Sequence, residues 1–292
     1  MSVTMTLTPE QVERLKEWVN DGWDLKEIPH AHFSAKKRDV SLTLYFSGKL
    51  VIQGKGTDEF IEMVLEPEIL QALIPVVDHD PVWRIGVDEA GKGDYFGPLV
   101  IAGVSAGEER LAALVRAGVR DSKTLTDPQV MKIAQEIRKI ARYSLVVIDP
   151  PKYNELYLKF GNLNHMLAWG HAQAIKALWQ EEHVQLARID QFAAPWVVES
   201  ALKKQGVTLR LEQKTKGESD PVVAAASILA RAGFLEGIHR SSLVAQWTLP
   251  KGAGAPVLEA ARQLVKARGK EILMQVAKVH FKTTLLVTAP DA

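Results

Sequence analysis

The chain has 292 residues, enough for one large domain or two ordinary ones, and 47% of them are hydrophobic, as is normal for a soluble globular protein. It contains no cysteine, which excludes disulfides, thiolate nucleophiles and cysteine zinc sites. The net charge of +1 hides an asymmetry, because residues 1–80 carry 8 Lys/Arg against 14 Asp/Glu and residues 81–292 carry the remaining 28 and 21.

The second part of the chain is therefore basic, which suits an enzyme that acts on a polyanion. The N-terminal sequence lacks a basic region followed by an apolar core, so we expect no secretory signal. No apolar run in the sequence looks long enough to span a bilayer. We expect a cytoplasmic monomer that does not associate with membranes.

The first 75 residues predict a small α/β domain. A helix is expected over residues 9–18, because Thr8 can cap it and a proline occupies its first position. Residues 38–46 alternate as a strand, a Ser-Gly turn follows, and residues 49–53 return as the second strand of a hairpin. A second helix is expected over residues 57–65.

A change of domain is expected after this unit. The sequence between Pro75 and Pro81 contains two prolines and three polar residues, which is typical of a linker. We therefore divide the chain into a domain at 1–75, a linker at 76–83 and a second domain at 84–292.

Strands and helices alternate in the second domain. Strands are expected at residues 85–88, 99–104, 143–148, 187–190 and 207–211, and helices at 129–141, 163–179 and 222–231. Asp127 and Asp220 are the expected N-caps of the first and last of these helices. His165 and His171 are expected to be core or surface residues of the 163–179 helix. This alternation predicts a mixed α/β sheet, in which sites gather outside the strand ends.

The segment from Arg84 to Pro98 is the most informative in the chain. Its strand ends in two adjacent carboxylates, Asp88 and Glu89, and a glycine-rich turn follows at once. Adjacent strand residues point to opposite faces, so we expect the glycines to supply a bend that brings both carboxylates to one cleft. Two anions beside exposed backbone N–H groups predict a hard-metal site next to a phosphate or sugar.

Two other roles compete for this segment. The carboxylates could be a solvated strand end or a helix cap. A dinucleotide-binding turn is disfavoured, because the glycine spacing is not GxGxxG and two preceding acids would repel a pyrophosphate.

Further carboxylates end or follow other predicted elements. Asp190 ends a strand, although a lone Asp at that place is usually a turn former or cap. Glu218 and Asp220 precede the last predicted helix, and the choice between them as a ligand stays open. Four carboxylates without Cys or clustered His suit Mg²⁺ or Mn²⁺ rather than zinc. Two such ions can clamp the attacking water and the leaving oxygen of a phosphodiester.

The chain contains the motifs Asp88-Glu89-Ala90-Gly91-Lys92-Gly93, Asp121-Ser122-Lys123, Ile189-Asp190, and Lys216-Gly217-Glu218 with the small-residue helix at 224–230. Together they resemble the type 2 ribonuclease H family. The segment Gly93-Asp94-Tyr95-Phe96-Gly97-Pro98 resembles, within that family, the ribonuclease HIII subgroup. The resemblance covers about residues 80–285. It implies an RNase H-like fold and Mg²⁺- or Mn²⁺-dependent cleavage of the RNA strand of RNA/DNA hybrids, leaving 5′-phosphate and 3′-hydroxyl ends.

The resemblance also implies the residues of the catalytic site. Its catalytic and metal-binding carboxylates would be Asp88, Glu89, Asp190 and Glu218, with Asp88 bridging two ions. Glutamate at the fourth position fits the ribonuclease HIII pattern, where ribonuclease HII usually has aspartate.

Nucleic-acid contacts follow from the same resemblance. The turn Gly91-Lys92-Gly93 would contact ribose 2′-hydroxyls, which distinguish RNA from DNA, although Lys92 replaces an arginine common in ribonuclease HII. Ser122, Lys123 and Lys216 would lie near phosphates, with loop capping or solvation as the alternative role.

The N-terminal domain of this subgroup resembles half of the TATA-binding protein and helps to grip the hybrid. Lys37 and Lys49 are candidate contacts on it, with a solvated surface as the alternative. Two other functions also stay open: ribonuclease HII-like cleavage at a single ribonucleotide embedded in DNA, and hybrid binding without catalysis.

Overall fold

The computed structural model describes residues 2–19, 22–61, 64–65, 69, 82–215 and 217–289. They belong to two compact units, Met1–His79 and Asp80–Ala292, and each unit is considered by itself. Residues 76–81 of the expected linker and the candidate contact Lys216 lie outside the described residues.

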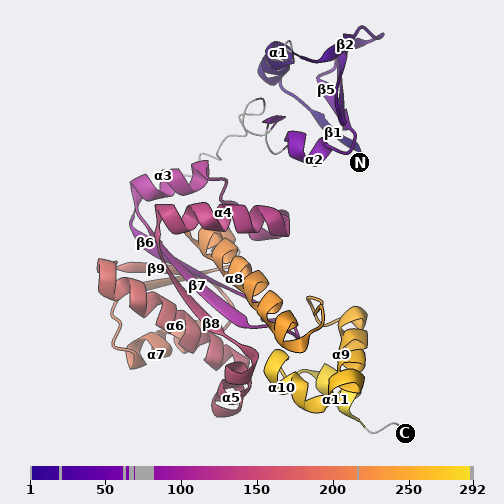
Figure 1. Cartoon of the computed structure of the whole chain (residues 1–292). Helices are drawn as coiled ribbons and strands as arrows, with labels where there is room; N and C mark the ends of the chain where they lie inside the picture. Colours follow the sequence, from indigo (N-terminus) through magenta and orange to yellow (C-terminus); the bar gives the residue numbers. More distant parts are fainter. Residues whose placement is uncertain are drawn as a thin grey trace. The chain divides into compact units, whose positions relative to one another are not determined.

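The N-terminal unit is a small α/β domain (Figure 1). Its antiparallel sheet has the strand order β1-β5-β4-β3-β2. The elements are β1 (Ser2–Thr6), α1 (Pro9–Trp18), β2 (Asp24–Lys26), β3 (Ala31–Lys37), β4 (Val40–Tyr45), β5 (Lys49–Gln53) and α2 (Thr57–Phe60). The predicted α1 is confirmed, since the Thr8 hydroxyl accepts a hydrogen bond from the Gln11 backbone N–H.

One strand boundary in this unit was predicted wrongly. Arg38, expected to begin a strand, lies in the turn between β3 and β4 with a φ of 47°, so β4 begins at Val40. The second strand of the hairpin is as predicted, because β5 spans Lys49–Gln53 and pairs with β4. Helix α1 covers one face of the sheet, where Val12 and Leu15 pack against buried strand residues such as Leu42.

The second unit is built on a mixed sheet, as predicted (Figure 1). Its strands are β6 (Arg84–Ala90), β7 (Leu99–Ala106), β8 (Arg142–Ile148), β9 (Leu186–Asp190) and β10 (Arg210–Lys214), in the order β10-β9-β6-β7-β8. β10, β9 and β6 run parallel, whereas β6, β7 and β8 run antiparallel. The strand ends of β6 and β9 therefore meet at one edge of the sheet.

Helices cover both faces of this sheet. They are α3 (Glu108–Arg116), α4 (Asp127–Ile140), α5 (Pro150–Phe160), α6 (Leu163–Glu182), α7 (Pro195–Lys204), α8 (Pro221–Ala245), α9 (Ala255–Arg268), α10 (Leu273–Val276) and α11 (Lys282–Thr288). Successive side chains of β7 point to opposite faces of the sheet. Val100 and Ala102 pack in the same hydrophobic cluster as α8, whereas Leu99 and Ile101 pack in the same cluster as α6.

Helix α8 corrects one expectation from the sequence. Within the described part of the chain, it is long and apolar enough to cross a membrane by length and composition. Most of it, 83% of the apolar window, is buried inside this unit, where it packs against β6 and β7. Its sixteen buried residues explain its composition, since a helix that is apolar on every side suits the centre of a domain.

Several other predicted boundaries differ from the structure, and the helix expected over residues 222–231 continues to Ala245. The N-cap of α4 is Thr126 rather than Asp127, because the Thr126 backbone N–H donates to the Gln129 side chain at 2.8 Å. β10 begins at Arg210, three residues later than expected, although the N-cap Asp220 of α8 is confirmed.

Candidate active site

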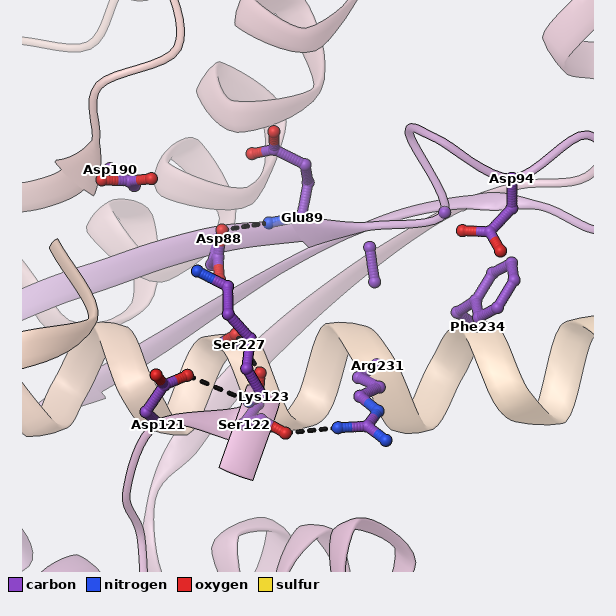
Figure 2. A pocket seen from close by; sticks show the side chains of 12 residues that line it. Asp88, Glu89, Asp94, Asp121, Ser122, Lys123, Asp190, Ser227, Arg231 and Phe234 are labelled. Carbon is purple, nitrogen blue, oxygen red and sulfur yellow. Dashed lines mark hydrogen bonds between the residues drawn. The ribbon is translucent and has the colours of Figure 1, made fainter. Parts of the chain in front are cut away.

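A pocket of about 340 Å³ lies at the sheet edge where β6 and β9 end (Figure 2). Its lining residues come from the end of β6 and the following turn, the loop before α4, the end of β9, and α8. They are Asp88, Glu89, Ala90, Gly91, Asp94, Asp121, Ser122, Lys123, Asp190, Ser227, Arg231 and Phe234. Three of the four predicted catalytic carboxylates thus line one pocket.

Asp88 and Glu89 reach this pocket from opposite sides of β6 (Figure 2). The expected bend between them is absent, because β6 pairs regularly with β7 through Ala90. Glu89 points toward α6, where it meets His171, and Asp88 points toward α8, where it meets Ser227. The pocket therefore wraps around the end of a straight strand.

Asp88 is held in a strongly desolvated position. Its Oδ1 accepts a hydrogen bond from the Glu89 backbone N–H at 2.8 Å. Burial, together with the neighbouring charge of Glu89, raises the pKa of Asp88 to about 6. A cation bound beside it would favour the charged form and reverse this shift.

Glu89 has different surroundings. Burial opposes its ionisation, but the hydrogen bond from His171 and the nearby ammonium of Lys92 bring the pKa of Glu89 below its usual value. The Nε2 of His171 lies 2.9 Å from Oε2, and the Nζ of Lys92 lies 3.7 Å from Oε1. Glu89 is thus stabilised as a carboxylate.

Asp190 ends β9, as predicted, and its Oδ1 accepts a hydrogen bond from the Gly217 backbone N–H at 3.0 Å. This contact brings the 3₁₀ helix η3 (Gly217–Ser219) against the end of β9. A β-carbon on Gly217 would lie 3.0 Å from the backbone of Asp190, so this approach suits glycine. Glu218 belongs to η3, and its side chain lies outside the described residues.

Asp220, the alternative to Glu218, has a structural role. Its Oδ2 accepts hydrogen bonds from Arg84 at 2.7 Å and from Arg188 at 2.9 Å. Its Oδ1 accepts from the Val222 backbone N–H at 2.8 Å. Burial opposes its ionisation, but the bond from Arg84 brings the pKa of Asp220 below its usual value. Both oxygens are therefore engaged away from the pocket.

The carboxylates suit a hard divalent cation by donor type, since all of them offer oxygen. In the side chains that the structure describes, no three His, Cys, Asp or Glu groups stand close enough to hold a metal ion as they are placed. Glu218 is outside that comparison. The fit to a metal therefore rests on the oxygen donors of one pocket and on the desolvated charge of Asp88.

The two glycines of the turn, Gly91 and Gly93, have different surroundings. Gly91 has a φ of 86°, and a β-carbon there would lie 2.2 Å from the Pro98 carbonyl oxygen. Gly93 meets nothing within 4 Å. Between them, the Lys92 ammonium lies 5.8 Å from the centre of the Phe192 ring. Gly91 is therefore required by packing, whereas Gly93 leaves open space.

The other predicted nucleic-acid contacts are placed differently from one another. Lys123 points into the pocket (Figure 2). Ser122 also lines the pocket, but its side chain is buried and its hydroxyl lies 2.8 Å from that of Ser227. Lys49 lies on the face of the N-terminal sheet opposite α1, whereas Lys37 lies on the α1 side with its ammonium 5.8 Å from the Trp23 ring.

Sequence reasoning missed several residues of this site. His171 was expected only as a core or surface residue of its helix, and it contacts Glu89. Arg231 donates to the Ser122 carbonyl and to Asp127 at 2.7 Å, which ties the loop before α4 to α8. The spacing of Ser227 and Arg231, four residues apart on α8, is the one sequence signal that could have placed both on the same side of that helix.

Comparisons with known proteins agree with this architecture. The family model described as Ribonuclease HII matches residues 85–284, and one described as a domain of unknown function matches residues 2–71. The chain is 46% identical to Ribonuclease HIII of Chlamydia felis, covering 93% of this chain and 91% of that protein. It is 43% identical to Ribonuclease HIII of Protochlamydia amoebophila, covering 92% and 90%.

Solved structures give the same result. The crystal structure of Bst-RNase HIII in complex with Mn²⁺ matches with a TM-score of 0.67 and 30% identity, covering 99% of both chains. The crystal structure of Aquifex aeolicus RNase H3 matches with a TM-score of 0.58 and 25% identity, covering 95% of this chain and 99% of that one. The chain shares an RNase H-like catalytic fold and a small N-terminal α/β domain with the solved structures. It is 43% and 46% identical to the two named relatives over 92% and 93% of its length. The chain therefore belongs to the ribonuclease HIII family.

Proposed function

We propose that this protein is an endonuclease that hydrolyses the RNA strand of RNA/DNA hybrids. The observation that carries the proposal is that Asp88, Glu89 and Asp190 line one pocket together with Gly91 of the glycine turn. Sequence identity of 43% and 45%, over 92% and 96% of this chain, to two proteins named Ribonuclease HIII supports the same reaction. We further propose that the products carry 5′-phosphate and 3′-hydroxyl ends.

The proposed cofactors are two Mg²⁺ or Mn²⁺ ions held by Asp88, Glu89, Asp190 and Glu218. When bound, such ions supply an activated water and neutralise charge that develops on the phosphodiester. The engagement of both Asp220 oxygens by Arg84, Arg188 and the α8 N-terminus supports Glu218 as the fourth ligand. The Mn²⁺ complex of Bst-RNase HIII supports the choice of metal.

The chain's own residues would position the substrate. Lys123, which lines the pocket, would neutralise a phosphate next to the scissile bond. The backbone of Gly91-Lys92-Gly93 would contact a ribose 2′-hydroxyl, for which the open space around Gly93 supplies room. Lys92 forms an ion pair with Glu89, so the Lys92 ammonium lies beside a proposed metal ligand.

Cleavage of a hybrid with an end-labelled RNA strand tests this function. Asp88→Asn and Asp190→Asn should each lower turnover by at least about 100-fold, more than the loss of an outer-shell partner. Glu155→Gln is the matched control, because that carboxylate is exposed on α5 and pairs only with its neighbour Lys152 in the described structure. Full activity in either Asp variant would refute the ligand assignment, and cleavage without any divalent metal would refute the mechanism.

The same assay distinguishes the remaining alternatives. A duplex with one embedded ribonucleotide should be cleaved more slowly than a long hybrid. The opposite preference would favour the ribonuclease HII-like reaction, and metal-dependent cleavage of any hybrid excludes a protein that only binds. We also propose a monomer in the cytoplasm, and sedimentation of the full chain tests the monomer.

For the N-terminal unit we propose a role in gripping the hybrid. Among the described residues of this unit, no helix covers the sheet face opposite α1, which carries Lys36, Lys49 and Thr43, beside an exposed Phe46 whose ring contacts His32. Lysines and aromatic rings on an open sheet suit a nucleic-acid backbone and its bases.

Charge reversal on the two sheet faces tests this role. Lys49→Glu should raise KM for the hybrid and reduce its salt dependence while turnover at saturation stays unchanged. Lys37→Glu is the control from the α1 side of the sheet. Equal effects of the two substitutions would refute a contact made by the open face.

A further inference from the structure

His171 is a buried polar residue that contacts a catalytic candidate. It lies on α6 with its side chain 0% exposed, and its ring packs 4.7 Å from that of Phe192. Its Nε2 lies 2.9 Å from Oε2 of Glu89. Its Nδ1 is also buried and has no hydrogen-bond partner among the described residues.

This geometry specifies which ring nitrogen faces the carboxylate. An ionised carboxylate only accepts hydrogen bonds, so the Nε2 of His171 must carry the hydrogen that it shares with Glu89. The ring therefore presents one directed donor, Nε2–H, to Glu89.

Glu89 needs such a restraint more than Asp88 does. It is the longer of the two carboxylates, and it leaves β6 on the side opposite to Asp88. The contact with His171 fixes Oε2 on the α6 side. Oε1 has the longer contact, 3.7 Å from the Lys92 ammonium, and is the oxygen that the proposal leaves for the metal ion.

We infer that His171 is a positioning residue, which holds the Glu89 carboxylate in the orientation that binds the metal ion. The inference rests on the proposed function. It extends that function by assigning a role to a buried residue outside the carboxylate set. Outer-shell partners of this kind are typically worth a factor of about 10 to 100 in metal affinity or activity.

Three substitutions on one helix test the inference in the full-length protein. His171→Leu removes the donor and keeps an apolar side chain of moderate size. His171→Gln can keep an N–H donor toward Glu89. His165→Leu is the matched control, because His165 is exposed on the same helix.

The readouts are Mn²⁺ affinity by calorimetry, turnover and KM on the hybrid, and thermal unfolding in chelator. His171→Leu should lose about 10- to 100-fold in Mn²⁺ affinity and lower turnover without raising KM for the hybrid. His171→Gln should recover most of both losses, and His165→Leu should match the wild type.

A double-mutant cycle shows whether His171 acts through Glu89. In a Glu89→Gln background, adding His171→Leu should cause no further loss of Mn²⁺ affinity, because the two residues form one unit. Additive losses would overturn the inference, as would wild-type Mn²⁺ affinity in His171→Leu.

A spectroscopic test does not depend on the folding of any variant. Nitrogen-15 spectra of the metal-free wild-type protein, labelled at histidine, should show His171 with a hydrogen on Nε2, and an Nε2 without a hydrogen would overturn the inference. The proposed function fails separately, if the wild-type protein does not cleave hybrids at all.

Discussion

The Nε of Arg84 donates a hydrogen bond to Oδ2 of Asp220 at 2.7 Å, which joins the first residue of β6 to the N-cap of α8. Arg84 is only 2% exposed, so its charge depends on this partner. The strand that carries Asp88 and Glu89 is thus tied to the helix that carries Ser227. The contact that joins these two pocket-lining elements links residues that are 136 positions apart in the sequence.

Glu218 and Asp220 should therefore give opposite phenotypes. Asp220→Asn should lower the free energy of unfolding by about 3 kcal/mol, because it removes a buried charge that pairs with both Arg84 and Arg188, while folded protein keeps its turnover. Glu218→Gln should leave stability nearly unchanged and abolish turnover. Urea denaturation and hybrid cleavage measure the two quantities. A stable but inactive Asp220→Asn would reverse the assignment.

The two glycines of the turn should also separate stability from activity. Gly91→Ala should lower the unfolding free energy by more than about 2 kcal/mol, because a φ of 86° strains an L-residue and its β-carbon would meet Pro98.

Gly93→Ala should change the unfolding free energy by less than about 0.5 kcal/mol, since nothing lies within 4 Å of the new carbon. It should nevertheless raise KM for the hybrid, because the methyl group would occupy the space proposed for the ribose. An unchanged KM in Gly93→Ala would argue against the contact at that turn.

The sequence predicted those parts of the fold that carry local signals. Helix α1 has a capping threonine and a proline at its start, and α8 has an aspartate followed by a proline, so both N-termini were predicted correctly. β10 was placed three residues early, because the apolar pattern begins at Val207 whereas pairing with β9 begins at Arg210. Pairing depends on the neighbouring strand, which the pattern of a single segment does not contain.

The same limit applies to the site. A strand-end carboxylate such as Asp190 is visible in the sequence, and the structure places it in the pocket with Asp88. The contact of His171 with Glu89 requires knowing that α6 covers the sheet face toward which Glu89 points. The engagement of Asp220 by Arg84 likewise depends on tertiary structure alone.

Asp88 should destabilise the metal-free protein. Its pKa is about 6 in the folded state, against an ordinary value of 3.8 for an aspartate in an unfolded chain. The folded state therefore binds more protons between these pH values, and stability falls as pH rises through this window. Above it, the charged group costs up to about 3 kcal/mol. Asp88→Asn should therefore be more stable than the wild type in chelator at neutral pH, by urea denaturation.

Added Mn²⁺ should reverse this order of stability. It should stabilise the wild type, which binds it, and leave Asp88→Asn almost unchanged. Equal stabilisation of both proteins by Mn²⁺ would show that Asp88 is not a ligand.

Lys278, which lies between α10 and α11, anchors the turn that follows β6. Its ammonium is fully buried and donates to the carbonyl oxygens of Asp94 at 2.8 Å and Gly97 at 2.7 Å. Burial lowers the pKa of Lys278 to about 7, against an attraction to Asp94 that raises it. The turn that follows Asp88 and Glu89 is thus held by a group that titrates near neutral pH.

The stability of the protein should therefore rise with pH above neutrality. Between pH 7 and 10.5 the unfolded Lys278 binds more protons than the folded one, so the free energy of unfolding increases with pH, by at most about 1.4 kcal/mol per pH unit. Lys278→Met removes this titration, and its unfolding free energy should vary less with pH across the window. Urea denaturation of both proteins from pH 7 to about 9, below the range in which ordinary lysines titrate, measures the difference. Parallel pH profiles would mean that the backbone carbonyls of Asp94, Phe96 and Gly97 keep the ammonium charged throughout.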